Sequence, residues 1–519
     1  MSHQFLLSEI TQADRGNLLS EALIGVADVR GVRLRLTLPG VLARLADSEL
    51  STIAFTGLQS HQSHAWHAFL VQLAAMVCQR AGVAESPTDA AWWADRLRDL
   101  AGGDAAWTLV VSDLAQPAFM QPPVPEGTLD GFVNHLATPG ALDLLVTAKN
   151  HDRKLETGSG DNAESWLFAF VSLQTGQGYS GKANYGVFRM NGGLGSRPGI
   201  GIQAGLDLGA VFRRDVNVVT TARCGVMERG MFLEDGLPLL WLKPWDGQKS
   251  LTWSELDPWA IECCRRVRLM KVAEEFSAVM VSTKVARVKV PDDHTGNVGD
   301  PWTPIGRAAK NLGKALTLPG AGFTYHRVAD LLLSGNWVPP PSQIIGPNDT
   351  DDLRWYGRTL VRGQGKTEGW HEREIPIPAT LRSRFATKSE RDRLADTAKH
   401  MIANAGVMRL NILKSSLLSL WEDAEGRIND GLMRLEQGVD IAFFPHLWDH
   451  PDSLDAWRER LADLARIILD QDISTLGPSV DRWRRISAAQ SRFHFLLRIK
   501  NHPDTGIFLP PSIPKAMTP

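Results

Sequence analysis

The stretch from Ser389 to Leu420, SERDRLADTAKHMIANAGVMRLNILKSSLLSL, decides the architecture because it opens a region of purely helical pattern. Its apolar side chains recur at helical spacing, whereas the chain before it mixes strand-like and helix-like runs. The apolar positions of this stretch are Leu394, Met401, Met408, Ile412 and Leu420. The composition changes near Thr387, and we place a domain boundary there.

Three more helical runs follow, separated by turn residues. We expect one from about Ile428 to Trp448, one that takes Asp452 or Ser453 as its N-cap, and one that starts after Pro478. Four helices with short connections predict a bundle.

Short strands and helices are expected upstream of the boundary. Val29 to Leu38 alternates apolar and polar residues as a strand does, and Leu50 to Arg80 has helical spacing that Gly82 closes. The Pro-rich stretch 116–128 predicts an irregular segment on the surface. Within residues 205–330, the runs AVFRRDVNVV, LPLLWLKPW and VMVSTKVARVKV indicate strands, with a helix near Trp259 to Leu269.

These patterns predict an α+β protein. A large mixed N-terminal domain with short strands and helices, residues 1–387, is followed by a C-terminal four-helix bundle with a short tail, residues 388–519.

The composition is that of a globular protein without a global charge excess. The chain has 519 residues, of which 43% are hydrophobic, and a formal net charge of −2. Any nucleic-acid surface must therefore be a local patch. No basic N-terminal region precedes a long apolar run, and no window approaches the ~20 apolar residues of a membrane span, so we expect a cytoplasmic protein that does not bind membranes.

The cysteines and histidines offer weak metal-site patterns. No CxxC pair occurs among Cys78, Cys224, Cys263 and Cys264, so we expect neither a disulfide framework nor a zinc site. The motif HQSHAWH places His61, His64 and His67 on one helix, where they form either a metal site or a polar helix face.

No catalytic motif stands out. GQGKT at 363–367 lacks the glycine that a phosphate-binding loop needs at Leu360, which favours a surface turn that holds Gln364 outward. WHERE at 370–374 is either a charged strand edge or part of a site. We therefore expect no catalytic residues, no metal and no cofactor.

Two segments are candidates for nucleic-acid contact. Nine glycines occur between Gly176 and Gly201, which indicates either tight turns or a backbone that another molecule approaches closely. The last predicted helix carries six basic residues and one acidic residue between Asp481 and Lys500, on either a solvated face or a phosphate-binding face.

The order of several weak motifs resembles the CasA family, the large subunit of the type I-E CRISPR surveillance complex Cascade. After the N-terminal strand-and-helix region come AFMQ (118–121), a long loop before an apolar helix, and the glycine-rich GQGYSGKANYG…NGGLGSRPG. Next are a Trp-Leu-Lys-Pro strand (241–244), DPWTPI (300–305), RGQGKTEGWHER (362–373) and the helical bundle. Some members carry a zinc module, but here Cys263 and Cys264 stand alone.

The resemblance implies a DNA-reading subunit that is not a nuclease. Such a subunit recognises a protospacer-adjacent motif from the minor groove, inserts a wedge so that guide RNA can pair, and steadies the displaced strand. Its implied partners are the other Cascade subunits, CRISPR RNA, double-stranded target DNA and a helicase-nuclease recruited in trans. Residues 1–387 would then form the domain that recognises this motif.

The resemblance also assigns roles to residues. Motif binding falls to Gly178, Tyr179, Gly181, Lys182, Asn184, Lys284 and Lys289, with Arg287 beside the last two. The wedge comprises Arg362, Gln364 and Lys366, and displaced-strand binding falls to Arg482, Arg485 and Arg492.

Two alternatives stay open from the sequence. A metal-dependent nuclease would use the His61 cluster, and a purely structural ribonucleoprotein scaffold would not read DNA.

Overall fold

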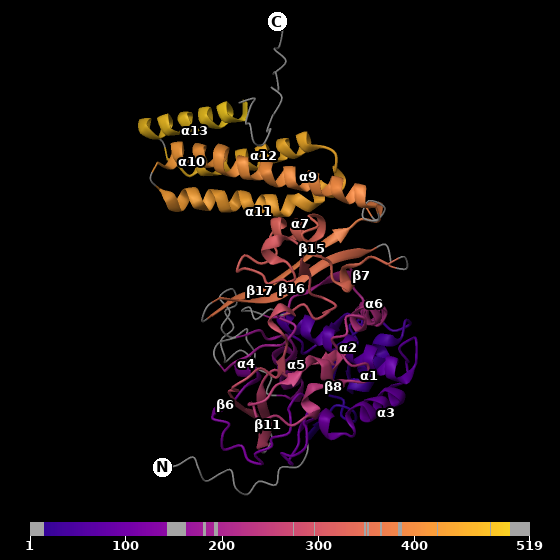
Figure 1. The fold of residues 1–519 in the computed structure, drawn as a ribbon. Coiled ribbons are helices and arrows are strands. Elements are labelled where there is room, and N and C mark those ends of the chain that lie inside the picture. The colour runs from indigo at the N-terminus through magenta and orange to yellow at the C-terminus, as the bar shows by residue number, and fades with distance from the viewer. Residues whose placement is uncertain are drawn as a thin grey trace, which may run out of the picture. The chain divides into compact units, whose positions relative to one another are not determined.

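The computed structural model in Figure 1 divides into two compact units. The first comprises Met1–Phe323 and Asn336–Ile377, and the second Thr324–Gly335 and Pro378–Pro519. The structure describes residues 15–142, 162–179, 183–190, 196–272, 275–294, 296–346, 349, 352–363, 366–381, 387–422, 424–477 and 479–498. The second unit thus begins upstream of the boundary expected near residue 387, and it takes in a short segment from the middle of the chain.

The first unit mixes helices with small sheets. Its helices are α1 Leu38–Ala46, α2 Ser63–Ala81, α3 Ala90–Ala101, α4 Pro139–Leu142, α5 Ala163–Gly176 and α6 Leu208–Met227. Its strands are β1 Arg15–Asn17, β2 Ile24–Ala27, β3 Arg33–Leu36, β4 Ala54–Phe55, β5 Thr108–Val110, β6 Asn134–Leu136, β7 Gly199–Ala204, β8 Leu237–Leu239, β9 Leu251–Thr252, β10 Leu256–Ile261, β11 Arg266–Val272, β12 Glu275–Val281, β13 Val288–Lys289, β14 Ile305–Gly306, β15 Trp337–Val338, β16 Leu353–Gly363 and β17 Lys366–Ile377. The three-stranded sheets have the orders β3-β2-β4, β11-β12-β6 and β17-β16-β7.

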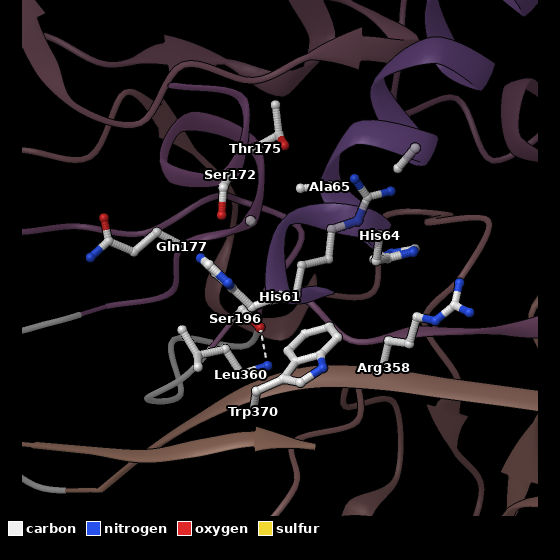
Figure 2. Close-up of a pocket in the computed structure, with 13 residues that line it drawn as sticks. His61, His64, Ala65, Ser172, Thr175, Gln177, Ser196, Arg358, Leu360 and Trp370 are labelled. Atoms are coloured by element: carbon white, nitrogen blue, oxygen red, sulfur yellow. Dashed lines mark hydrogen bonds between the residues drawn. The ribbon is translucent and has the colours of Figure 1, made fainter. Parts of the chain in front are cut away.

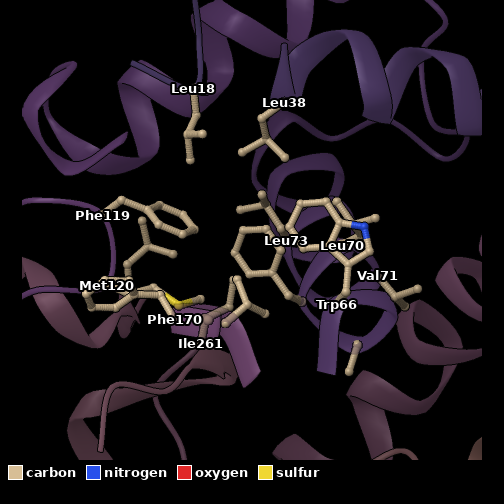
Figure 3. Packing of buried hydrophobic residues seen from close by; sticks show 14 of the residues in the cluster. Leu18, Leu38, Trp66, Leu70, Val71, Leu73, Phe119, Met120, Phe170 and Ile261 are labelled. Carbon is tan, nitrogen blue, oxygen red and sulfur yellow. The ribbon is translucent and has the colours of Figure 1, made fainter. Parts of the chain in front are cut away.

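The core of this unit forms around α2 and α5, which are apolar on most sides. Figure 3 shows Trp66, Leu70 and Leu73 of α2 gathered with Phe170 of α5 and Phe119. The helix expected from Leu50 begins only at Ser63, because β4 and a 3₁₀ turn at Ser60–Gln62 use the preceding residues. Gly82 does close α2, in a left-handed conformation with φ 67°.

Several strand and helix expectations are wrong in the middle of the chain. The run AVFRRDVNVV lies in α6, which Asp207 caps by accepting hydrogen bonds from Gly209 and Ala210. The helix expected near Trp259 to Leu269 is instead β10 and β11, and all six residues of β10 are buried. A fully buried strand lacks the alternation that would distinguish it from a buried helix.

Smaller corrections concern the N-terminal half. The strand expected over Val29 to Leu38 is limited to β3, because Gly31 turns the chain with φ 79° and Leu38 already begins α1. The stretch AFMQ (118–121) is buried rather than on the surface. Its Gln121 side chain bonds backbone groups of Leu109, Phe119 and Leu269.

The second unit is helical, as the sequence predicts. It contains α7 Tyr325–Leu333, α9 Lys388–Val407, α10 Lys414–Trp421, α11 Glu425–Asp449, α12 Leu454–Ser474 and α13 Val480–Arg498. A π-helical segment at Met408–Leu413 joins α9 to α10, so they continue as one helix. Ser453 caps α12 by accepting from Ala456 N at 3.3 Å. Figure 1 shows α9 to α13 side by side, coloured orange to yellow. The α+β fold class is therefore confirmed.

None of the helices among the described residues is long and apolar enough to cross a membrane.

Candidate nucleic-acid interface

A closed loop forms the described part of the glycine-rich segment. Val187 N donates to Gln177 O at 2.8 Å, and the backbones of Gly178 and Gly186 touch so closely that a Cβ on Gly186 would lie 2.3 Å from the Gly178 carbonyl carbon. The buried Arg265 guanidinium donates to the carbonyls of Gly178 at 3.4 Å and Asn184 at 3.3 Å. We call the described residues of this segment, 177–179 and 183–187, the clamped loop.

The predicted motif-binding residues are only partly described. Gly178 is buried, while Tyr179 and Asn184 are half-buried. Gly181 and Lys182 lie outside the described residues.

The clamped loop contacts the turn that carries Lys284. Thr283 N donates to Ala183 O at 3.1 Å, and the Tyr185 hydroxyl donates to Lys284 O at 2.9 Å. The Lys284 side chain is exposed. Two sequence candidates a hundred residues apart are thus neighbours, although Lys284 lies on a turn after β12 rather than on the expected strand.

Tyr185 is a neighbour that the sequence analysis does not single out. Its ring centroid is 6.3 Å from that of Tyr179, and its hydroxyl is the direct link to Lys284. The motif YSGKANY, in a chain with only four tyrosines, is the signal that could have marked it.

The other two basic candidates in this region differ from Lys284. Lys289 is exposed on β13, where it pairs with Thr252 of β9. Arg287 is buried and donates to the carbonyls of Leu240 and Lys243, both at 2.7 Å. Burial lowers the pKa of Arg287 to about 10. Arg287 therefore holds the Leu240–Leu242 3₁₀ turn, which stands where a Trp-Leu-Lys-Pro strand was expected.

The predicted wedge lies at the end of a β-hairpin. β16 and β17 pair along their length down to Gly363 opposite Lys366, and GQGKT therefore joins two strands rather than a strand and a helix. The register shifts between Val361 and Arg362, where Gly369 adopts φ 138°. Such a bulge increases the local twist of a hairpin. Gln364 itself lies outside the described residues, and of Arg362 and Lys366 only the backbone is described.

The glycine-rich segment and the hairpin share one base. Gln177 and Ser196, near the two ends of the segment, form an antiparallel bridge. Ser196 N donates to Leu360 O at 2.7 Å, and Leu360 N donates to Ser196 Oγ at 2.6 Å, the dashed line in Figure 2. Ser196 is thereby anchored to β16, and Gln177 is joined to β16 through Ser196.

The histidines of HQSHAWH lie beneath this base and are not a polar helix face. His61 and His64 are buried around a cavity of about 20 Å³, which has room for about one water molecule (Figure 2). Burial, and then the nearby Arg197, holds the pKa of His64 well below its usual value. His67 Nε2 lies 2.8 Å from the buried Asp215 carboxylate.

Metal-ligating residues do not gather anywhere in the described part of the chain. Groups of three or more His, Cys, Asp or Glu side chains able to hold a metal ion are absent there. All four cysteines are free thiols.

The basic residues of α13 do not share one face. Arg482 and Arg492 are exposed, whereas Arg485 turns inward to Asp481 at 3.3 Å, Glu422 at 4.0 Å and the Leu420 carbonyl at 3.5 Å. Two aromatic side chains are exposed on this helix, Trp483 at 64% and Phe495 at 60%, so the apolar spacing that predicts a buried Trp483 is wrong at this residue.

Comparison with solved structures shows which known proteins share the fold of this chain. No family model matches this sequence, and no curated protein matches it either. Among solved structures, Thermus thermophilus CasA (Cse1) is 14% identical with a TM-score of 0.59, covering 93% of this chain and 99% of its own. Thermobifida fusca Cse1 is also 14% identical, with a TM-score of 0.59, and the match covers 93% of this chain and 98% of the other.

A third similar chain comes from a structure described as a CRISPR RNA-guided surveillance complex. It is 11% identical with a TM-score of 0.59, and the match covers 93% of this chain and 100% of the other. The resemblance seen in the sequence is thus confirmed in three dimensions: over nearly its whole length, this chain has the fold of the CasA (Cse1) proteins.

Proposed function

We propose that this chain is the large, non-catalytic subunit of a CRISPR RNA-guided DNA surveillance complex. The observation that carries the proposal is the match, over 93% of the chain, to CasA (Cse1) structures and to a chain of such a complex. In this function the chain reads a protospacer-adjacent motif, opens the duplex, steadies the displaced strand and recruits a helicase-nuclease.

Motif reading would fall to the clamped loop together with Lys284. The minor groove of B-DNA is about 6 Å wide, which favours insertion of a narrow backbone loop and a long cationic side chain. Arg265 and the contact between Gly178 and Gly186 fix the loop before binding. A preorganised loop loses less entropy on binding.

Duplex opening would fall to the hairpin tip at Gln364. Inserting a side chain between base steps costs a few kcal/mol per step, while the guide heteroduplex that follows is about as stable as the DNA it replaces. Because β16 bonds Ser196, which in turn bridges Gln177, motif reading and duplex opening would be mechanically linked through this strand.

Strand binding would fall to the exposed part of α13. Arg482 and Arg492 can neutralise phosphates without reading sequence. Arg485 is occupied by Asp481 and Glu422, so we assign it a structural role rather than a DNA contact.

The test uses the assembled complex and two lysine variants. Lys284→Ala should weaken binding to a closed duplex that bears the motif, by about 5- to 150-fold for a lost contact of ~1–3 kcal/mol. It should leave binding to a target already opened by a mismatched bubble near normal. Lys310→Ala is the matched control, since Lys310 is also exposed but is not among the predicted motif-binding residues.

The outcomes separate the competing functions. Binding that ignores the motif would favour the structural scaffold. Cleavage by the purified chain with Mg²⁺ or Mn²⁺, lost in a His61→Ala/His64→Ala double variant, would favour the metal-dependent nuclease.

A further inference from the structure

The strand β3 forms an open edge of a small sheet in the first unit. The sheet has the order β3-β2-β4, so among the described residues β3 has a neighbouring strand on one side only. Its residues Arg33, Leu34 and Arg35 are all exposed. An open edge carries backbone N–H and C=O groups that another strand can bond.

The β2–β3 turn shows which backbone groups of β3 face this edge. Asp28 N donates to Val32 O at 3.1 Å, so these two residues form a bonded pair. Bonded and non-bonded pairs alternate along antiparallel strands, which makes Leu34 the next residue of β3 that bonds β2. The backbone groups of Arg33 and Arg35 therefore point away from β2.

The other side of β2 agrees with this pattern. The carbonyls of Gly25 and Ala27 accept hydrogen bonds from the β4 side, at 2.9 Å each. These two residues lie opposite Arg35 and Arg33, so the two pairs are the non-bonded ones. The edge thus offers two N–H donors and two C=O acceptors to a further strand.

Exposed aliphatic side chains accompany the edge. Val32 and Leu34 are 49% and 40% exposed, and Val29 in the turn is 65% exposed. Leu34 lies opposite Val26, which is buried in the core, so Leu34 stands on the core side of the sheet and still remains partly uncovered. A further strand would cover it, because directly opposite side chains lie on the same face. Three such neighbours favour an interaction surface.

The charge of the edge favours an acidic partner. Arg30 and Arg33 form no ion pair with a described residue, whereas Arg35 lies 3.0 Å from Glu164. The nearby Asp28 carboxylate accepts from two backbone N–H groups of the turn, both at 2.9 Å. A second copy of this edge would place arginine opposite arginine, which is destabilising. The edge therefore fits a different protein.

We propose that β3 takes up an extended segment of a partner protein as an added antiparallel strand, and that acidic and aliphatic residues alternate in that segment. Acidic residues lie opposite Arg33 and Arg35, and the aliphatic residue between them lies opposite Leu34. Main-chain bonds to the two arginines supply affinity, and the alternating side chains supply specificity. Nucleic acid fits this edge less well, because its phosphates leave the carbonyls and the aliphatic side chains unmatched.

The test is a fluorescence-anisotropy titration of the full-length chain with a labelled peptide whose core is Glu-Val-Glu-Val-Glu. This peptide should bind, whereas a Lys-Val-Lys-Val-Lys core and a Val-Val-Glu-Glu-Glu core should not. The lysine core reverses the charge, and the block core keeps the composition while it destroys the alternation. High salt should weaken binding of the first peptide, because the arginines are exposed.

Variants of Arg33 separate the side chain from the backbone. Arg33→Ala should weaken binding by roughly 2- to 5-fold through the lost cross-strand charge pair. Arg33→Pro should weaken it by a further roughly 2- to 12-fold, since proline also removes an N–H group that β2 does not use. Arg307→Ala is the matched control, because it removes an exposed arginine of the first unit outside this sheet, and it should leave binding unchanged.

A second measurement leaves the protein unaltered and covers a proline variant that does not fold. N-methylation of two glutamates in the peptide removes N–H groups that meet β3 in an antiparallel pair, whereas N-methylation of the two valines removes N–H groups that face away. The first change should abolish binding, and the second should retain it.

Four outcomes would overturn the proposal. They are no binding at millimolar peptide, equal binding of the alternating and block cores, equal loss with both methylated peptides, and displacement of the peptide by a single-stranded oligonucleotide whose own binding Arg33→Ala removes. Dimerisation of the chain that Arg33→Pro abolishes would assign the edge to a second copy instead. Thermal unfolding of each variant checks the fold. Motif-dependent DNA binding by the complex is a separate measurement, so this proposal and the proposed function can fail independently.

Discussion

Replacing Gly186 by alanine tests whether the closed form of the clamped loop reads DNA. The added Cβ would lie 2.3 Å from the carbonyl carbon of Gly178 and 2.6 Å from Tyr179 N. Carbon atoms prefer about 3.5 Å or more, so the two backbone segments must separate by about 1.2 Å. The atoms that the added Cβ would meet belong to the backbone of Gly178 and Tyr179, so the contact cannot be relieved by moving a flexible side chain.

The energetic cost of this close contact is of the size found when extra carbon atoms are forced into packed protein interiors. Forcing one extra carbon into a close contact costs about 1–3 kcal/mol, which lowers the population of the closed loop by about 5- to 150-fold relative to open forms. If only the closed loop reads the motif, apparent affinity for closed duplex falls by up to the same factor.

The assay compares two alanine variants in the assembled complex. Gly186→Ala should lose binding to closed, motif-bearing duplex and keep binding to a bubble target. Gly176→Ala is the control, because its Cβ would meet nothing nearer than Ala65 Cβ at 3.9 Å. Equal affinities of the two variants for closed duplex would refute the reasoning, and equal losses on duplex and bubble would assign Gly186 to the fold alone.

Three further predictions concern other elements. Arg482→Ala and Arg492→Ala should each lower the salt dependence of target binding by about one unit of slope, whereas Arg485→Ala should lower the melting temperature of the chain and leave that slope unchanged. Gln364→Ala should slow strand opening on relaxed DNA, and negative supercoiling should partly rescue it; equal opening rates would exclude Gln364. Because burial lowers the pKa of His64, the unfolded chain takes up a proton near pH 6.5 that the folded chain refuses, so stability should fall as pH drops through that value, by at most about 1.4 kcal/mol per pH unit. Urea unfolding at about pH 7.5 and about pH 5.5 checks this, and an equal pH dependence in His64→Gln would contradict it.

Local chemistry let the sequence alone predict the helices after residue 387, although not that Thr324–Gly335 belongs to the same unit. Ser453 in the second unit and Gly82 in the first mark helix ends, because a side-chain cap and a left-handed glycine are properties of single residues. The helical spacing of Leu394, Met401 and Met408 persists in the structure because one face of each long helix is buried.

Patterning failed where the neighbours of an element decide what it buries. All six residues of β10 are buried, Asp257 included, so no alternation marks it as a strand; the β-branched run of α6 reads as a strand although its buried side chains have helical spacing. The prediction for the histidines was wrong for the same reason. The sequence pattern of His61 and His64 is that of a polar helix face, and only the tertiary structure brings the β16–β17 hairpin and Arg197 against them.

The residues of the candidate interface could be nominated from the sequence, but not their arrangement. Glycine content and resemblance point to residues 176–201, and exposure of Lys284 follows from its charge. Only the tertiary structure decides that Tyr185 joins Lys284, that Arg265 closes the loop, and that Arg485 faces inward. Such contacts join segments some 65 to 100 residues apart, and nothing in the local pattern of either segment encodes its partner.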